Sequence, residues 1–478
     1  MDAAFLYAET ANAPLNVIAA VVLEPSSTEP AARFETLRAQ VASRLLPHPV
    51  LREKLVEVPL GLDHPRWIAD VRFDLDDHVH RAVLRPPGGE AELDRYIAQL
   101  AETPLRRDRP LWEIHVVEGL AGGRTALVAK MHHAAADGVG GVGMLAALFD
   151  RDPDGKELVP VAAPPEPREE APPSSLDLLG DAAWALGGRP LRGVSRLLRG
   201  GTGARLLRAA WTRAPGLPSA PSTPWNGPIS GRRHVATGSV SLDDVRAIKR
   251  AAAATVNHVV LAACAGALRE HLAGDGEPPG EPLVAAVPMA LDGRGDAANA
   301  LSVLLVRLPV HLARAVDRLA AAREASLEAM RLHEEIGPQL REWADLGVPA
   351  LFAGAAQLYH RLGLAALHAP IHNVTISNVP GPPEPLWCAG ARVASCHPFG
   401  PIYDGWGLNL TVMSYAGRLG IGAVACPERV PDLERIPRAF EASVAGLLRA
   451  TGGAGAQPAS SASARRAKSV DSSARKKR

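Results

Sequence analysis

The segment from His132 to Gly138 combines residue types that could carry out acid–base chemistry. It reads His132-His133-Ala134-Ala135-Ala136-Asp137-Gly138. A neutral imidazole has a pKa close to physiological pH, so a histidine here could take a proton from a hydroxyl group. The alanines leave the approach to the rings open, and Asp137 is placed to brace the loop. Gly138 and the glycines that follow it permit tight turns and the close approach of a ligand.

Three kinds of site fit this composition. A histidine at the end of a strand could be the general base in acyl transfer from a thioester to an alcohol, which also requires a donor for the oxyanion. The two histidines could instead be core residues satisfied by hydrogen bonds. They could also bind a metal ion, with Asp137 as a third ligand. The motif alone does not separate these alternatives.

The elements that must position the motif are predicted by the apolar pattern of residues 1–150, which indicates one α/β unit. Apolar, β-branched or alternating runs predict strands at 16–23, 112–117 and 125–131. Apolar residues at helical spacing predict helices at 34–45, 92–100 and 138–148. The third of these strands ends at His132, so the histidine pair is expected at the junction of a strand and a loop.

Residues 226–450 predict a second α/β unit. Strands are expected at 234–241, 283–287, 302–308, 374–377, 408–414 and 418–424. Helices are expected to begin at Leu242 and to span 256–268. A short turn at 415–417 joins two of the strands as a hairpin, so the sheet must be mixed rather than all-parallel.

Residues 151–225 form a linker and a crossover between the two units. Proline, glutamate and alanine dominate 151–173, which cannot form a packed core. Residues 189–213 carry seven arginines and no acid, with leucines and Trp211 between them. This arginine-rich stretch is either a solvated insertion or an element for contact with a membrane surface. Residues 451–478 predict a disordered basic tail.

Charge and cysteine content exclude several classes of protein. The formal net charge is +1, which gives no support to a nucleic-acid-binding body. The four cysteines are sparse and form no CxxC pair, so reduced thiols are expected rather than disulfides or a zinc site. The N-terminus lacks the pattern of a secretory signal, and no long uncharged apolar run predicts a spanning helix. A cytoplasmic protein is expected.

Several sequence blocks in addition to the histidine motif resemble one protein family. HHxxxDG at a strand end, in a chain with two α/β halves, is similar to the CoA-dependent acyltransferase superfamily. The chain further resembles the bacterial wax ester synthase/acyl-CoA:diacylglycerol acyltransferase family. The matching blocks are MDAAFLYAETANAPLNV at the start, FDLDDHV at 73–79, RPLW at 109–112, WNGPISGRRH at 225–234, TVNHVVLA at 255–262, SNVPGP at 377–382 and DGWGLNLTVMSY at 404–415. Together they extend over about residues 1–445.

The resemblance implies roles for individual residues. His133 inherits the role of general base, while His132 orients the loop or shapes the channel. Asp137 is implied to be a structural brace beside Gly138. Pro110, Leu111 and Trp112 would line the path of acyl-CoA or of the acyl chain. Asn257 would stabilise the reacting carbonyl group or the local fold.

The resemblance also implies the fold and the reaction. Two chloramphenicol-acetyltransferase-like domains with mixed sheets would enclose an active-site tunnel between them. The expected reaction transfers a fatty acyl group from acyl-CoA to diacylglycerol or to a long-chain alcohol, with no covalent intermediate and with no cofactor or metal. Because such acceptors reside in lipid, peripheral contact with the inner membrane face or with lipid droplets is expected. The alternatives are a different hydroxyl acceptor, or a non-catalytic protein of lipid surfaces.

Two departures from the family pattern affect the second half. The family's block has Asn-Asp where this chain has Asn257-His258. If the missing acid anchors a helix, its loss could shift the C-terminal part of the site. An arginine expected soon after Val287-Pro288 is also absent, and Leu291-Asp292-Gly293 stands there instead. Asn299 and Ser302 partly recover the later pattern.

Overall fold

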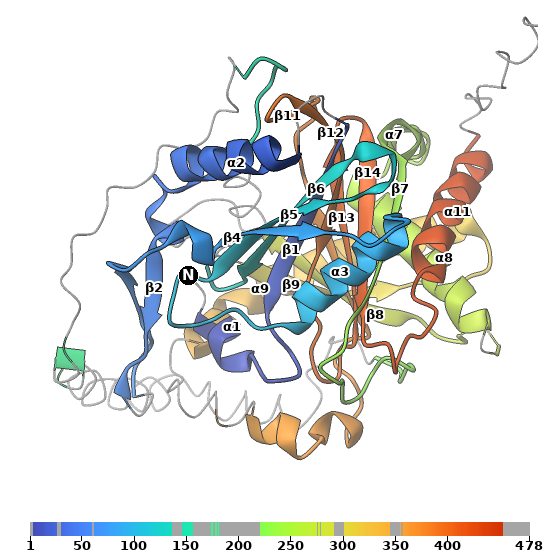
Figure 1. Cartoon of the computed structure of the whole chain (residues 1–478). Coiled ribbons are helices and arrows are strands. Elements are labelled where there is room, and N and C mark those ends of the chain that lie inside the picture. The colour runs from blue at the N-terminus through green and yellow to red at the C-terminus, as the bar shows by residue number, and fades with distance from the viewer. Residues whose placement is uncertain are drawn as a thin grey trace, which may run out of the picture.

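Two six-stranded sheets form the framework of the protein in the computed structural model (Figure 1). The structure describes residues 3–25, 30–59, 62–135, 146–155, 220–274, 279–290, 301–344 and 357–452, with a few isolated positions between them. Strands separated by helices make both halves mixed α/β, which confirms the predicted fold class.

The first sheet carries the histidine motif on one of its central strands. Its order is β11-β12-β1-β6-β5-β4. The strands are β1 (Asn16–Leu23), β4 (Val79–Val83), β5 (Trp112–Glu118), β6 (Thr125–His132), β11 (Trp387–Cys388) and β12 (Ala391–Phe399). Strands β4 and β5 are parallel, and the other pairs are antiparallel. In the register of β1 and β6, Asn16 lies opposite His132.

Helices cover both faces of this sheet because successive side chains of a strand point to opposite sides. Ile18 and Ala20 of β1 pack in one buried cluster with Ile97 of α3 (Glu90–Glu102). Val21 packs on the other side with Leu37 of α2 (Pro30–Gln40). The remaining elements of this half are α1 (Ala3–Ala8), the hairpin β2 (Glu53–Val56) and β3 (Arg66–Ala69), the π-helix Val41–Leu45, and the 3₁₀ turns Pro49–Leu51, Leu75–Asp77 and Ala121–Gly123.

The second sheet has the order β7-β14-β13-β10-β8-β9. Its strands are β7 (His234–Ser241), β8 (Leu283–Ala290), β9 (Leu301–Leu308), β10 (Val374–Val379), β13 (Leu408–Tyr415) and β14 (Arg418–Ala425). Strand β10 is parallel to both β13 and β8, whereas the other pairs are antiparallel. The predicted mixed sheet and the hairpin at 415–417 are therefore confirmed.

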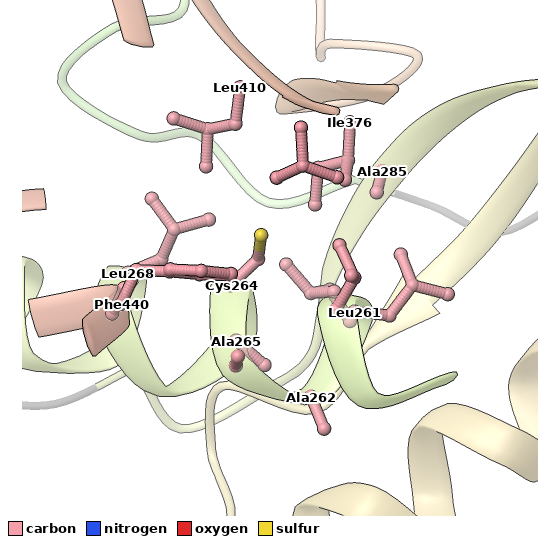
Figure 2. Packing of buried hydrophobic residues seen from close by; sticks show 14 of the residues in the cluster. Leu261, Ala262, Cys264, Ala265, Leu268, Ala285, Ile376, Leu410 and Phe440 are labelled. Carbon is pink, nitrogen blue, oxygen red and sulfur yellow. The ribbon is translucent and has the colours of Figure 1, made fainter. Parts of the chain in front are cut away.

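The largest core cluster lies between this sheet and its helices. These are α7 (Leu242–Ala251), α8 (Val256–Gly274), α9 (Ala315–Ala344) and α11 (Arg435–Ala450), with a 3₁₀ turn at Leu364–Ala366. Helix α8 is apolar on nearly all sides, and Figure 2 shows Cys264 and Leu268 near Ile376 and Leu410. A Cβ atom at Gly266 would lie 2.2 Å from the Ser443 hydroxyl, so this glycine permits close packing of α8 on α11.

The two sheets approach each other directly where β12 lies against β14. A Cβ atom at Gly420 would lie 2.4 Å from the carbonyl oxygen of Cys396, and one at Gly422 would lie 2.0 Å from that of Pro398. Only glycine allows backbones to approach this closely. Strands β11 and β12 thus join the first sheet although their residues fall within 226–450, the range expected to form the second unit.

The cysteines and the longer helices bear on two further expectations from the sequence. All four cysteines are free, and Cys264, Cys388 and Cys426 are buried. Burial raises the pKa of Cys264 and of Cys388 to about 12. Within the described residues no single helix is long and apolar enough to cross a membrane; α7 and α8 meet that test only together, as a pair bent by 103°.

Candidate active site

The histidine pair lies at the C-terminal end of β6, a central strand of the first sheet. His132 is its last residue, and its backbone N–H donates to the carbonyl of Leu111 at 3.0 Å. The N–H of His133 donates to the carbonyl of Leu15 at 2.9 Å. The pair is therefore held between the start of β1 and the residue that precedes β5, as the predicted strand–loop junction requires.

His132 is a buried brace for its own loop. The residue is 1% exposed. Its Nδ1 accepts a hydrogen bond from the N–H of Ala134 at 3.0 Å, so Nδ1 carries no proton. Its Nε2 lies 3.5 Å from Oε1 of Glu9. This tautomer fixes the ring between the loop and the carboxylate, which agrees with the loop-orienting role implied for His132.

Glu9 lies beside His132, and the sequence analysis did not identify it as part of the site. Its carboxylate accepts hydrogen bonds from Arg107 at 2.9 Å and from the N–H of Leu15 at 3.2 Å. Burial alone would raise the pKa of Glu9, but His132 and Arg107 outweigh it and lower that pKa to about 2. The ionised carboxylate therefore persists at neutral pH. The signals in the sequence were its isolated position as an acid between Ala3 and Leu23 and its place in the family-like block at the start of the chain.

His133 has different surroundings from its neighbour. Its side chain is half-buried, and its ring stacks on Phe5 with centroids 3.9 Å apart and an interplanar angle of 17°. An apolar cluster lies around the loop, formed by Leu6, Leu55, Leu105, Leu111, Ala134 and Ala135 with Phe5, Trp67 and Met131 packed against it. The second histidine thus combines partial exposure with an apolar wall, which suits a base that acts on a fatty substrate.

Behind the pair lies a charged cluster on neighbouring strands. The side chain of Lys130 is 1% exposed, and its Nζ lies 3.5 Å from Oε2 of Glu113. Burial lowers the pKa of Lys130. Burial would raise the pKa of Glu113, yet His115, Lys130 and His80 lower it to about 2. Tyr96 hydrogen-bonds to Nδ1 of His115 at 2.9 Å.

Among the described residues, one group of side chains has ligand atoms close enough together to bind a metal ion, and it belongs to this cluster. Ligand atoms of His80, Glu113 and His115 all lie within 4.8 Å of one another. Lys130 already places a cationic group beside the Glu113 carboxylate, where a bound cation would compete with it. The arrangement is that of a charge-paired cluster. His132 lies outside this group, since its two ring nitrogens face Ala134 and Glu9.

Asp137 and Gly138 lie outside the described residues, so their roles as structural brace and turn residue remain predictions. Within the described part, bracing of the histidine loop comes from His132 itself and from Glu9. The arginine-rich stretch 189–213 and the Leu291-Asp292-Gly293 departure lie wholly outside the described residues. The expected helix at 138–148 also lies outside them, except for residues 146–148.

Pro110, Leu111 and Trp112 are all buried, but they do not share one environment. Leu111 packs in the apolar cluster with Ala134 and Ala135, beside the histidine loop. Trp112 lies in the core cluster on the other side, where its indole N–H donates to the carbonyl of Leu51 at 2.8 Å. Its ring stacks on His78 with centroids 4.5 Å apart. Lining of an acyl path by the three residues stays a prediction.

The departure at Asn257-His258 is compensated within the first turn of α8. The N–H of Thr255 donates to Nδ1 of His258 at 3.2 Å, and the N–H of His258 donates to the Thr255 hydroxyl at 3.2 Å. This is a reciprocal capping box in which an imidazole replaces the usual carboxylate. Burial lowers the pKa of His258, which favours the neutral acceptor form. Asn257 is half-buried in that turn, and its proposed contact with the substrate stays a prediction.

The turn at 404–407 holds neighbouring segments together. The Asp404 carboxylate accepts the N–H of Ile229 at 2.9 Å and contacts His360. Asn226 donates to the carbonyl of Gly405 at 2.7 Å. The block at 225–234 also reaches the first half, because Arg233 bonds to the carbonyl of Asn12. These bonds tie the loop that carries Glu9 to the second half of the chain.

Solved structures share this architecture of two sheets. The wax ester synthase/diacylglycerol acyltransferase from Marinobacter aquaeolei VT8 matches with a TM-score of 0.67 and 27% identity, over 94% of this chain and 98% of that one. The first condensation domain of the calcium-dependent antibiotic synthetase matches with a TM-score of 0.53 and 17% identity, over 95% and 94%. The class of protein is therefore the two-sheet acyltransferase and condensation-domain fold.

Sequence comparison narrows the class to a family. The wax ester synthase/diacylglycerol acyltransferase catalytic domain matches residues 1–260, and the C-terminal domain of the same family matches residues 297–447. A Mycobacterium tuberculosis protein provisionally named a diacylglycerol O-acyltransferase is 35% identical over 460 residues, which is 94% of this chain and 89% of that protein. A Mycobacterium bovis protein, named in the same way, is 34% identical over 94% and 98%. The chain belongs to the wax ester synthase/diacylglycerol acyltransferase family.

Proposed function

We propose that the protein transfers a fatty acyl group from acyl-CoA to the hydroxyl group of diacylglycerol or of a long-chain alcohol. Membership of the family supports the reaction, and relatives with which the chain aligns almost throughout are named for it. The observation that carries the proposal is the division of roles in the histidine pair. His132 is buried and braced by Glu9, whereas His133 is half-exposed beside an apolar cluster.

In the proposed mechanism, His133 takes the proton of the acceptor hydroxyl as the oxygen attacks the thioester carbonyl. The tetrahedral oxyanion then collapses and expels the thiolate of CoA, which recovers the proton from His133. Asn257 is proposed to donate to the oxyanion. These steps account for every proton and bond without a cofactor. Acyl-CoA is a substrate that is consumed, not a group that stays bound to the protein.

Glu9 and His132 act as positioning residues in this mechanism. The Glu9 carboxylate favours the tautomer of His132 whose Nδ1 accepts the Ala134 N–H. That bond spans the loop on which His133 sits, so it limits the movement of the base. We further propose that the two substrates meet in a tunnel between the halves, and that the protein acts at the cytoplasmic surface of a membrane or lipid droplet, where the acceptor resides.

The test is direct. Purified protein is given palmitoyl-CoA with either dipalmitoylglycerol or hexadecanol, and both the release of CoA and the ester product are measured. The proposal predicts stoichiometric thiol and ester with at least one acceptor. Thiol release without ester, or no turnover with either acceptor, would refute it.

A further inference from the structure

Exposed apolar side chains gather on the segment 358–371. Leu358, Leu362, Leu367 and Ile371 are 54%, 60%, 76% and 55% exposed. They are four of the nine large apolar side chains that are well exposed in the described part of the chain. Figure 1 shows this segment in orange, as short helical turns at the lower edge of the molecule. A concentration of this kind marks an interaction surface rather than random exposure.

Two polar side chains of this region, Gln357 and His360, anchor it to the body of the protein. Gln357 donates to the carbonyl of Glu9 at 3.2 Å. His360 contacts the buried carboxylate of Asp404, and the Tyr359 hydroxyl bonds to His368 at 2.6 Å. Leu358 and Leu362 lie one helical turn apart, and the Leu362 N–H donates to the Leu358 carbonyl at 3.0 Å. The segment is therefore anchored through polar groups and turns its leucines outward.

The charge of the surface selects one kind of occupant. Residues 346–383 contain no aspartate or glutamate. Arg361 is exposed between the outward-facing leucines, and His368 is exposed nearby. Exposed apolar side chains beside the cationic Arg361, in a stretch of sequence with no acid, suit a layer of anionic lipid headgroups above acyl chains.

The surface also lies next to the candidate active site. Gln357 bonds to the backbone of Glu9, and the side chain of Glu9 faces His132. A hydroxyl acceptor dissolved in a lipid layer at this surface would thus be held close to the histidine pair. We propose that the 358–371 surface docks the protein on an anionic lipid bilayer and admits the acceptor from it. This inference rests on the proposed function for the identity of the acceptor.

Vesicle flotation tests the docking surface. The vesicles contain phosphatidylcholine, phosphatidylglycerol and dioleoylglycerol, and the variant is the double substitution Leu362→Glu and Leu367→Glu. Removing two inserted leucines is expected to weaken binding by about tenfold or more. The matched control is Val71→Glu with Val83→Glu, since these side chains are 84% and 67% exposed in the first half, and it should bind like the parent protein. Equal binding by parent and variant would overturn the proposal, as would equal loss in the control.

A second measurement separates docking from chemistry. Ester formation from palmitoyl-CoA is compared for dioleoylglycerol in the vesicles and for a water-soluble short-chain alcohol. The leucine variant should lose activity on dioleoylglycerol while it keeps the parent's rate on the soluble alcohol, and its thermal unfolding should match that of the parent. Equal loss on both acceptors would refute delivery through this surface. Vesicle binding by His133→Ala should equal that of the parent protein, because docking does not require the reaction. If the parent protein shows no turnover, the proposed function is refuted, and vesicle flotation still decides whether the surface docks on lipid.

Discussion

Adjacent histidines of one motif differ in what surrounds them, and this difference supports the roles proposed for them. His132 is 1% exposed and is fixed by Ala134 and Glu9, so it cannot move freely toward a substrate. His133 is half-buried and stacks on Phe5. In the proposed mechanism, the residue that holds the loop and the residue that exchanges protons are thus neighbours in the chain.

The first prediction concerns Glu9. Glu9→Gln removes the charge that faces His132 but keeps the size of the side chain. Because the base is then held less firmly, kcat is expected to fall by up to about 100-fold, with KM for acyl-CoA little changed. The control is Glu57→Gln, since Glu57 is a 69% exposed carboxylate that also pairs with Arg107. An unchanged kcat in Glu9→Gln, or an equal loss in the control, would show that Glu9 does not position the base.

Glu9 was beyond prediction from the sequence for a physical reason. Its partners are His132 and Arg107, about a hundred residues away, and the contact exists only because β1 pairs with β6 in one register. By contrast, the position of His133 at a strand–loop junction was predictable, because that strand and loop are local in sequence. The position of a single residue can be predicted from the sequence where the contacts that fix it are close in the chain.

At the scale of elements, the first turn of α8 shows how a family departure is accommodated. His258 accepts the Thr255 N–H, as an aspartate or glutamate at the same position would. His258→Ala is expected to lower the free energy of unfolding by about 1 kcal/mol, because one capping bond is lost. His258→Asp should retain that free energy or raise it slightly, since an acid is favoured near a helix N-terminus. Urea unfolding measures both, and an equal loss in both variants would contradict the capping role.

Most strands were predicted from apolar and β-branched runs, and the structure has strands at each predicted position. Strand β12 was missed. Its sequence, ARVASCHPF, mixes charged, small and polar residues, and its partner β1 is more than 350 residues away in the chain. The pattern of one segment cannot reveal such a pairing, and so the shared first sheet was not foreseen either.

The contact of β12 with β14 gives a prediction about how the sheets meet. A methyl group at position 422 would lie 2.0 Å from the carbonyl oxygen of Pro398, a backbone atom that cannot rotate away. Gly422→Ala is therefore expected to reduce the free energy of unfolding by about 3 kcal/mol. Gly446→Ala is the control, because its nearest neighbour would lie at 3.9 Å. The midpoints of thermal unfolding are compared for the two variants. Similar midpoints would contradict the close approach of the β12 and β14 backbones.

At the scale of the whole molecule, buried histidines predict a loss of stability in acid. Burial lowers the pKa of His372 from 6.5 to about 4, and also lowers those of His48, His78, His80, His258 and His397. The unfolded chain therefore binds protons below about pH 6.5 that the folded chain does not, and the free energy of unfolding falls toward pH 4. At about 1.4 kcal/mol per pKa unit, His372 alone accounts for about 3 kcal/mol.

Urea unfolding across this pH range measures the effect. The free energy of unfolding should decrease steadily below about pH 6.5, and His372→Phe should reduce the slope while keeping a ring against Trp406. A free energy that is constant or that rises toward pH 4 would contradict the assignment of these histidines as buried and neutral.

At the same scale, the proposed base, its proposed brace and the outward apolar surface are linked, because Gln357 bonds to the backbone of Glu9 and Glu9 faces His132. The central claim is that His133 is the general base of an acyl transfer. The most direct measurement is the rate of ester formation from palmitoyl-CoA and hexadecanol by His133→Ala, with His234→Ala of β7 as a control. The account predicts a rate lower by about 10²–10⁴-fold for His133→Ala and an unchanged rate for the control. A rate for His133→Ala close to that of the parent protein would contradict it.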